Sequence, residues 1–157
     1  MTRSAHIRPM VAADVPMVAR LLRELAEKFI VHEFVADARA SFLSKNDEAA
    51  IAQFVADGFR YHVAEIDGMI VGFVGMRDNR HLYHLFVAER FHRRGIAKRL
   101  WDVASLECRG QGHTGPFTVN SSNNAVAIYE RLGFRRTAPV QDNGGVLFNP
   151  MALVPDA

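Results

Sequence analysis

A basic turn that joins a strand to a helix decides the fold. It reads His81-Leu-Tyr-His-Leu-Phe-Val87, then Ala88-Glu-Arg-Phe91, then His92-Arg-Arg-Gly-Ile-Ala97. Gly95 allows a ligand to approach the backbone closely, and a helix start offers unpaired N–H groups with a partial positive charge. The basic side chains nearby are Arg93, Arg94, Lys98 and Arg99. These features fit an anion site and a plain solvated turn equally well. No Walker A loop or three-glycine dinucleotide fingerprint is present.

Upstream of this turn, the pattern predicts an antiparallel meander of three strands. Tyr61 to Ile66 leads into Asp67-Gly68, a strong two-residue hairpin signal, and Met69 to Met76 forms the return strand. Arg77 to Arg80 is predicted to be a second turn, and His81 to Val87 the third strand.

Two helices are predicted before the meander, after a short strand at His6 to Pro9. Asp14 is a suitable N-cap, and Pro16 falls in the first turn, where its missing N–H has no helical partner to lose. The second helix is expected from Ala38 to Val55, ended by Gly58. Apolar residues of the first helix recur at helical spacing at Val15, Val18, Leu21, Leu22, Leu25 and Phe29.

Downstream, a helix is expected from Gly95 to Arg109, with Gly110 and Gly112 ending it. The remaining elements are a strand at Pro116 to Asn120, a helix capped by Ser121 or Ser122 and closed at Leu132 and Gly133, and a strand at Val146 to Leu153. The predicted order is therefore β-α-α-β-β-β-α-β-α-β, a mixed α/β fold. Without a linker or repeat, residues 1–157 read as a single domain.

Composition narrows the class of protein. The chain has 157 residues, of which 49% are hydrophobic, enough for one packed domain. Its net charge is only +2, and its one cysteine, Cys108, forms no intrachain disulfide. Met1 to Met10 has no signal-peptide core, and no stretch is long enough to span a membrane. We therefore expect a cytoplasmic protein that does not bind membranes.

Two segments resemble the motifs of one known family. The strand 81–87 followed by His92-Arg-Arg-Gly-Ile-Ala97 is similar to motif A of the GNAT acetyltransferases, a strand and then Q/R-x-x-G-x-G/A at a helix start. Asn120-Ser-Ser-Asn-Asn-Ala125 with Tyr129-Glu-Arg-Leu-Gly-Phe134 resembles motif B, a Tyr shortly before Gly-Phe. The resemblance runs from about Ile7 to Met151. It departs from the family at His92, usually Gln or Arg, and at Ser122, often Asn.

The resemblance implies a GNAT-like fold with a mostly antiparallel sheet flanked by helices. It also implies acetyl transfer from acetyl-CoA to an amine by direct attack on the thioester. The cofactor-binding residues it indicates are Leu85, Phe86, Val87, His92, Arg93, Arg94, Gly95, Ile96, Ala97, Lys98, Asn120 and Asn124. Leu85 to Val87 would pair with the pantetheine arm, and amides from Arg93 to Lys98 would hold the pyrophosphate. Ser122 and Asn123 are alternatives for the pantetheine contact.

The chemistry needs a neutral amine, a donor for the oxyanion and a proton for the leaving thiolate. By the resemblance, Tyr129 is the general acid, since a phenol is neutral at physiological pH. By the same resemblance, the base expected on the strand is His81, with Glu65, His84 and solvent as alternatives. No Cys, Asp or Glu completes a zinc site with the two histidines, so no metal is expected.

Two other functions compete with catalysis. A CoA-binding sensor would keep the fold without the chemistry, and a nucleic-acid binder would use the arginine cluster with strongly salt-dependent affinity. The intact turn and Tyr129 favour the enzyme, so no nucleic-acid partner is expected. The acceptor amine and the choice between monomer and homodimer stay open.

Overall fold

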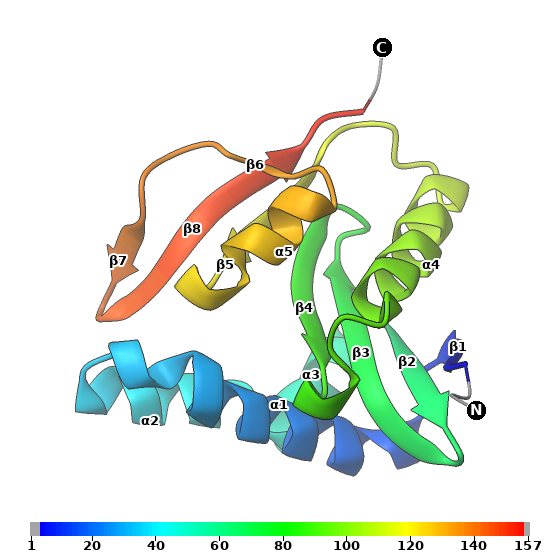
Figure 1. Cartoon of the computed structure of the whole chain (residues 1–157), viewed down its shortest axis with the longest axis horizontal. Helices are drawn as coiled ribbons and strands as arrows, with labels where there is room; N and C mark the ends of the chain where they lie inside the picture. The colour runs from blue at the N-terminus through cyan, green and yellow to red at the C-terminus, as the bar shows by residue number, and fades with distance from the viewer. Residues whose placement is uncertain (1–3, 156–157) are drawn as a thin grey trace.

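A computed structural model describes residues 4–155. Its strands form a sheet in the order β1-β2-β3-β4-β5-β8-β6, with β7 paired to β8 at one side (Figure 1). Every strand pair is antiparallel except β4 with β5. The strands are β1 (His6–Pro9), β2 (Arg60–Ile66), β3 (Met69–Arg77), β4 (His81–Val87), β5 (Phe117–Ser121), β6 (Arg135–Arg136), β7 (Gln141–Asn143) and β8 (Val146–Leu153).

Helices cover both faces of this sheet and enclose two cores. The helices are α1 (Val15–Phe29), α2 (Ala36–Ser44), α3 (Glu48–Ala56), α4 (Ile96–Gly110) and α5 (Val126–Arg131). Strand alternation separates the cores: Val63 packs with α1 to α3, whereas the next residue, Ala64, packs with α4 and α5. In Figure 1, α4 and α5 face the viewer. None of the described helices is long and apolar enough to cross a membrane.

The predicted mixed α/β fold and its main order are confirmed, and the Asp67-Gly68 hairpin is present. Asp67 and Gly68 have φ of 51° and 78°, the left-handed pair that a tight hairpin turn requires. The very short strands β6 and β7 were not predicted. They span only Arg135–Arg136 and Gln141–Asn143. These segments are too short to show an alternation of polar and apolar residues in the sequence.

The prediction of one helix from Ala38 to Val55 is wrong, because the chain breaks between α2 and α3. Asp47 caps α3 by accepting a hydrogen bond from the Ala50 amide at 2.9 Å. Asn46 donates from Nδ2 to the Phe42 carbonyl at 2.9 Å. Both side chains compete with helical backbone bonds, which explains the break. The break turns Asn46 toward β4, where it becomes relevant to the site.

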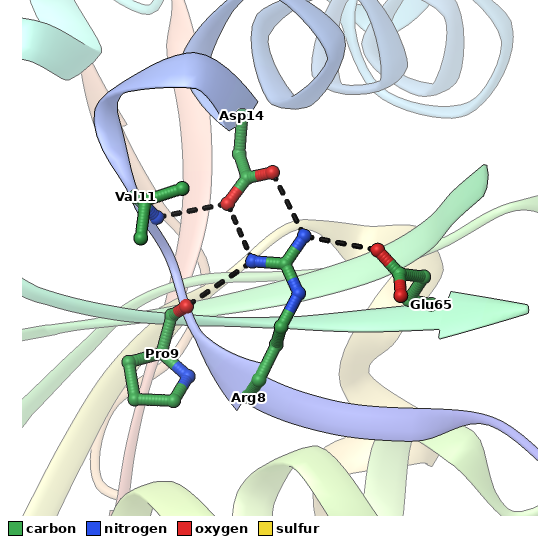
Figure 2. Close-up of polar contacts among 5 residues, drawn as sticks. All are labelled: Arg8, Pro9, Val11, Asp14 and Glu65. Carbon is green, nitrogen blue, oxygen red and sulfur yellow. Dashed lines mark hydrogen bonds and ion pairs between the residues drawn. The ribbon is translucent and has the colours of Figure 1, made fainter. Parts of the chain in front are cut away.

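Asp14 occupies the predicted N-cap position of α1 but uses its carboxylate elsewhere. It accepts from the Val11 amide at 2.8 Å and from both terminal nitrogens of Arg8, at 2.8 and 2.9 Å (Figure 2). Arg8 also donates to Glu65 at 3.0 Å. The Arg8 hydrogen bonds lower the pKa of Asp14. This cluster ties β1, the start of α1 and β2 together.

Strands β4 and β5 separate soon after they meet, and this shapes the site. Their only paired residues in the described chain are His81 with Thr118 and Leu82 with Val119. Beyond Leu82, the side of β4 that faces away from β3 has no strand partner. A β-bulge lies at Tyr83, because Met76 pairs with Leu82 while the preceding Gly75 pairs with His84. Bulges of this kind redirect side chains next to functional sites.

Candidate active site

The unpaired edge of β4 leaves backbone groups without a strand partner beyond Leu82. The Ala88 amide donates to the Val71 carbonyl of β3 at 2.7 Å. In an antiparallel pair, successive residues point their backbone N–H and C=O groups alternately toward and away from the partner strand. The backbones of Phe86 and Ala88 therefore face β3, and those of Leu85 and Val87 face away from it. Of the three predicted backbone contacts, Leu85 and Val87 have free amides for a ligand, whereas Phe86 belongs to the β3 ladder.

The turn after β4 has the geometry of an anion site. Arg93 and Gly95 have φ of 65° and 76°, so the backbone alternates through the left-handed region and forms a nest of amides. Within residues 4–155, no protein atom accepts a hydrogen bond from the amides of residues 93–98. A Cβ built on Gly95 meets nothing within 4 Å, which leaves space beside the helix start. Arg93 is not glycine, so its left-handed backbone is strained, and the surrounding structure must hold it there.

The basic side chains of the turn differ in how free they are. Lys98 is paired with Asp102 at 2.7 Å, and Arg94 lies over the Phe91 ring at 5.2 Å. Arg93, Arg94 and Arg99 are exposed and form no ion pair within the part of the chain that the structure describes. Their guanidinium groups, unlike the paired Lys98, are therefore available to phosphates.

His92 has a side-chain role that the sequence did not reveal. Its Nε2–H donates to the Val87 carbonyl at 2.6 Å, and its ring lies 6.2 Å from that of Phe29. The bond uses the outward carbonyl of Val87 and ties the basic turn to the end of β4. Ile96 is buried beneath the turn, and Ala97 is half-buried.

Tyr129 lies on α5, 7% exposed, and its ring packs edge-on against Phe134 at 5.8 Å. Its hydroxyl makes no hydrogen bond within residues 4–155. Among the described residues, the one side-chain nitrogen or oxygen that is both fully buried and without a partner is His62 Nδ1. The Tyr129 hydroxyl is therefore not completely enclosed by protein. Burial raises the pKa of Tyr129, which holds the phenol in its proton-donating form.

The asparagines at the end of β5 and just after it divide into those with side-chain hydrogen bonds and those without. Asn123 donates to Glu33 at 2.7 Å and accepts from Asn149 at 2.8 Å, so both ends of its amide are used. Asn120 and Asn124 are exposed, and neither side chain has a hydrogen bond among the described residues. These two, rather than Asn123, have amides available to a pantetheine arm.

His81 begins β4, 7% exposed, with its Nδ1 2.8 Å from the Thr118 hydroxyl. Its Nε2 has no partner among residues 4–155, and because it is not one of the fully buried atoms it keeps some exposed surface. Burial, with help from Arg77 and Arg80, lowers the pKa of His81 to about 4. The ring is therefore neutral at physiological pH.

The two alternative bases are engaged elsewhere. His84 donates from Nε2–H to Asn46 Oδ1 at 2.8 Å and accepts at Nδ1 from the Tyr61 hydroxyl at 2.9 Å. Both ring nitrogens are used, and burial lowers the pKa of His84 to about 3. Glu65 lies on β2, away from the open edge of β4, and forms an ion pair with Arg8 of β1. His81 is thus the remaining side-chain base of the three.

His84 should make folding sensitive to acid. Its pKa is about 3 in the native state and near the ordinary value of 6.5 in the unfolded chain. Between these values the unfolded state binds a proton that the native state excludes, so stability falls as pH falls, by about 1.4 kcal/mol per pH unit. His84→Gln should flatten the dependence of the unfolding free energy on pH between 6 and 4, measured by urea denaturation. The exposed His6→Gln is the control, and an unchanged slope in His84→Gln would contradict the assignment.

Sequence reasoning missed four hydrogen bonds: Thr118 with His81, Asn46 with His84, Tyr61 with His84, and the His92 side chain with the Val87 carbonyl. The first three join residues more than twenty positions apart, so no local spacing in the sequence indicates them. Within residues 4–155 no group of three or more His, Cys, Asp or Glu side chains is arranged to hold a metal.

Comparison with known proteins identifies the class. A sequence profile of the acetyltransferase (GNAT) domain matches residues 26–155. A GCN5-related N-acetyltransferase from Rhodopseudomonas palustris superposes with a TM-score of 0.82 over 99% of this chain and 98% of its own, at 19% identity. The PaiA N-acetyltransferase of Thermoplasma acidophilum, in complex with coenzyme A, gives 0.78 over 98% and 100%, at 18% identity. The chain belongs to the GNAT acetyltransferase family.

A curated relative is more similar in sequence over a shorter region. Human N-acetyltransferase 8 is 34% identical over 91 residues, which cover 51% of this chain and 40% of that protein. The match therefore spans about two fifths of the length of the relative.

Proposed function

We propose that the protein transfers an acetyl group from acetyl-CoA to an amine. The observation that carries the proposal is the continuity of free backbone donors. They run from the outward amides of Leu85 and Val87 into the unpartnered amides of residues 93–98. The first set suits an extended arm with amide groups, and the second suits a pyrophosphate at a helix N-terminus. Coenzyme A has both parts in one molecule, so it fits this arrangement.

The cofactor contacts follow from this arrangement. Leu85 and Val87 would bind the pantetheine arm, with Asn120 and Asn124 as its side-chain partners. The amides from Arg93 to Lys98, around Gly95, would hold the pyrophosphate, aided by the charges of Arg93 and Arg99. His92, Ile96 and Ala97 support this turn from beneath, and Phe86 anchors the strand to β3. When bound, acetyl-CoA supplies the activated acyl group.

The protein's own residues would then supply the proton transfers and the polarisation. An outward amide of β4 would donate to the developing oxyanion. Tyr129 would give its proton to the leaving sulfur, which its free hydroxyl and raised pKa favour. His81 would receive the amine proton. Three residues lie between His81 and Leu85, a separation of about 10–13 Å along a strand, so the proton would pass through bridging water.

The acceptor would approach from the side of β4 that carries His81. Strands β4, β5 and β8 contain no Asp, Glu, Lys or Arg, so these strands provide no fixed carboxylate for a polycation. Selection by charge would come from the segment around α1 and α2, where Lys28, Glu33 and Arg39 lie. The aminoglycoside 6'-N-acetyltransferase that shares this fold has an amine acceptor, as its name states. We place the reaction in the cytoplasm, where the single buried Cys108 stays reduced.

Cofactor binding is the first test of the proposal. We expect coenzyme A and acetyl-CoA to raise the melting temperature, because a ligand that binds only the native state stabilises it by RT ln(1 + [L]/Kd). At a hundredfold excess over Kd this amounts to about 2.7 kcal/mol. Differential scanning fluorimetry measures it, with adenosine as a control that lacks the pyrophosphate and the arm. No shift at millimolar coenzyme A would contradict the proposal.

The role of His81 predicts a particular pH profile. A base with the ordinary histidine pKa would make kcat/KM rise with pH around 6.5. Burial, however, lowers the pKa of His81 to about 4. Protonation of His81 should therefore lower kcat/KM only near pH 4. The rise of kcat/KM through neutral pH should come from deprotonation of the acceptor amine. His81→Ala should slow turnover at pH 7 by about 10²-fold, the low end for general bases, because a group with a low pKa is a weak base. An unchanged rate, with acetyl-CoA binding intact, would assign the proton to solvent.

A further inference from the structure

Thr118 and His81 lie side by side where β4 and β5 meet. They are paired residues on neighbouring parallel strands, and the Thr118 amide donates to the Arg80 carbonyl at 3.1 Å. On its other side, Thr118 pairs with Ala152 of β8. Its backbone is therefore held from both sides, just before the strands separate. A rigid position of this kind suits a residue that must hold another in place.

The two side chains share a face and a hydrogen bond. Their strand neighbours Leu82 and Val119 point into the core beneath α4, so His81 and Thr118 point to the opposite face. Thr118 Oγ1 lies 2.8 Å from His81 Nδ1. A β-branched threonine has few χ1 rotamers, so its hydroxyl is well fixed. His81 Nε2 is left without a protein partner among residues 4–155 and keeps some exposed surface.

The direction of this hydrogen bond decides what Nε2 can do. A neutral imidazole carries one N–H, and a threonine hydroxyl can either donate or accept. If Oγ1 donated to Nδ1, the ring proton would sit on Nε2, which could then accept nothing. If Oγ1 accepts from Nδ1–H, Nε2 keeps its lone pair. Only the second arrangement allows His81 to act as a base toward the acceptor side.

Building on the base role proposed for His81, we propose that Thr118 is a positioning residue that fixes the Nδ1–H tautomer of His81. Its Oγ1 accepts from Nδ1–H, and Nε2 presents its lone pair to the water next to the acceptor amine. In the proton transfer, the amine N–H bond breaks and its proton goes to the bridging water, which releases a proton to Nε2, so the water is regenerated. The Nδ1–H···Oγ1 bond is retained. The imidazolium is therefore oriented and stabilised by the same threonine.

A double-mutant cycle tests the functional part. Thr118→Val keeps the shape but removes the hydroxyl, and should lower kcat by about 3- to 10-fold, the equivalent of one net hydrogen bond. Thr118→Ser should recover most of the rate, and the melting shift with coenzyme A should be unchanged in both. In a His81→Ala background, Thr118→Val should have no further effect on kcat. Additive effects in the double variant, or a Thr118→Val enzyme as fast as wild type, would overturn the proposal.

The tautomer itself is measurable without turnover. Long-range ¹H–¹⁵N spectra at pH 7 distinguish the two ring nitrogens, and His81→Gln identifies the signal among the seven histidines. We expect Nδ1–H in the wild type and loss of this preference in Thr118→Val. An Nε2–H tautomer in the wild type would overturn the proposal. If the protein acetylated no amine, the reaction assignment would fail, while this spectrum would still decide how Thr118 and His81 are bonded.

Discussion

Replacement of Tyr129 by Phe should lower kcat by about 10²–10⁴-fold, the usual contribution of a positioned proton donor. The leaving sulfur would then depart as an unprotonated thiolate. The affinity for acetyl-CoA and the melting temperature should change little, because the hydroxyl makes no hydrogen bond to the described protein. Steady-state kinetics with both substrates, alongside fluorimetry of the free variant, separates these effects.

Tyr61→Phe is the matched control, because it also removes a tyrosine hydroxyl but should change stability rather than catalysis. That hydroxyl donates to His84 Nδ1 in the core, so its loss should lower the melting temperature. Burial also raises the pKa of Tyr129, so activity should not decline through deprotonation of this group at pH 8 or 9. Near wild-type turnover of Tyr129→Phe would reduce Tyr129 to a packing residue against Phe134.

The second large effect is expected from Gly95→Glu, which should abolish binding of coenzyme A while the fold is retained. The side chain would enter the open space beside Gly95 and bring a negative charge to the amides that would hold the pyrophosphate. Gly95 has a positive φ, so any L-residue there also costs about 1–2 kcal/mol of backbone strain. Titration calorimetry with coenzyme A measures the loss of binding.

Gly112→Glu supplies the control for strain and charge. Gly112 also has a positive φ, 101°, and a Cβ there also meets nothing within 4 Å, but it lies after the far end of α4. This variant should lose similar stability and bind coenzyme A normally. Normal binding by Gly95→Glu would show that the turn at residues 93–98 is not the phosphate site.

Local signals in the sequence predicted the elements that local chemistry determines. Asp67-Gly68 predicts a turn because few other residues tolerate two successive positive φ values, and the hairpin is where it was expected. Gly95 predicts the helix start for the same kind of reason. The break before α3 was missed, although Asn46 and Asp47 are both good terminators, because the apolar spacing continues across them.

The sequence indicated a set of candidate site residues but not their protonation states. His81 was placed on the expected strand, yet its lowered pKa depends on burial and on arginines of the preceding turn. The engagement of His84 depends on Asn46 and Tyr61, which the fold brings from other elements. Which backbone amides of β4 are free depends on the strand register with β3, set by the bulge at Tyr83. These features arise from contacts between residues far apart in the sequence, which the local spacing of residue types does not reveal.

The most direct test of the account is acetyl-CoA consumption across an amine library. The library should include peptide N-termini, lysine derivatives, polyamines, amino acids and aminoglycosides. Release of the free thiol would be followed with a thiol reagent, and each product would be identified by mass spectrometry. The account predicts that at least one amine gives coenzyme A and its N-acetyl derivative in equal amounts, and that Tyr129→Phe suppresses both. A protein that binds coenzyme A but releases no thiol above the uncatalysed rate with any amine would contradict catalysis and leave a coenzyme A sensor.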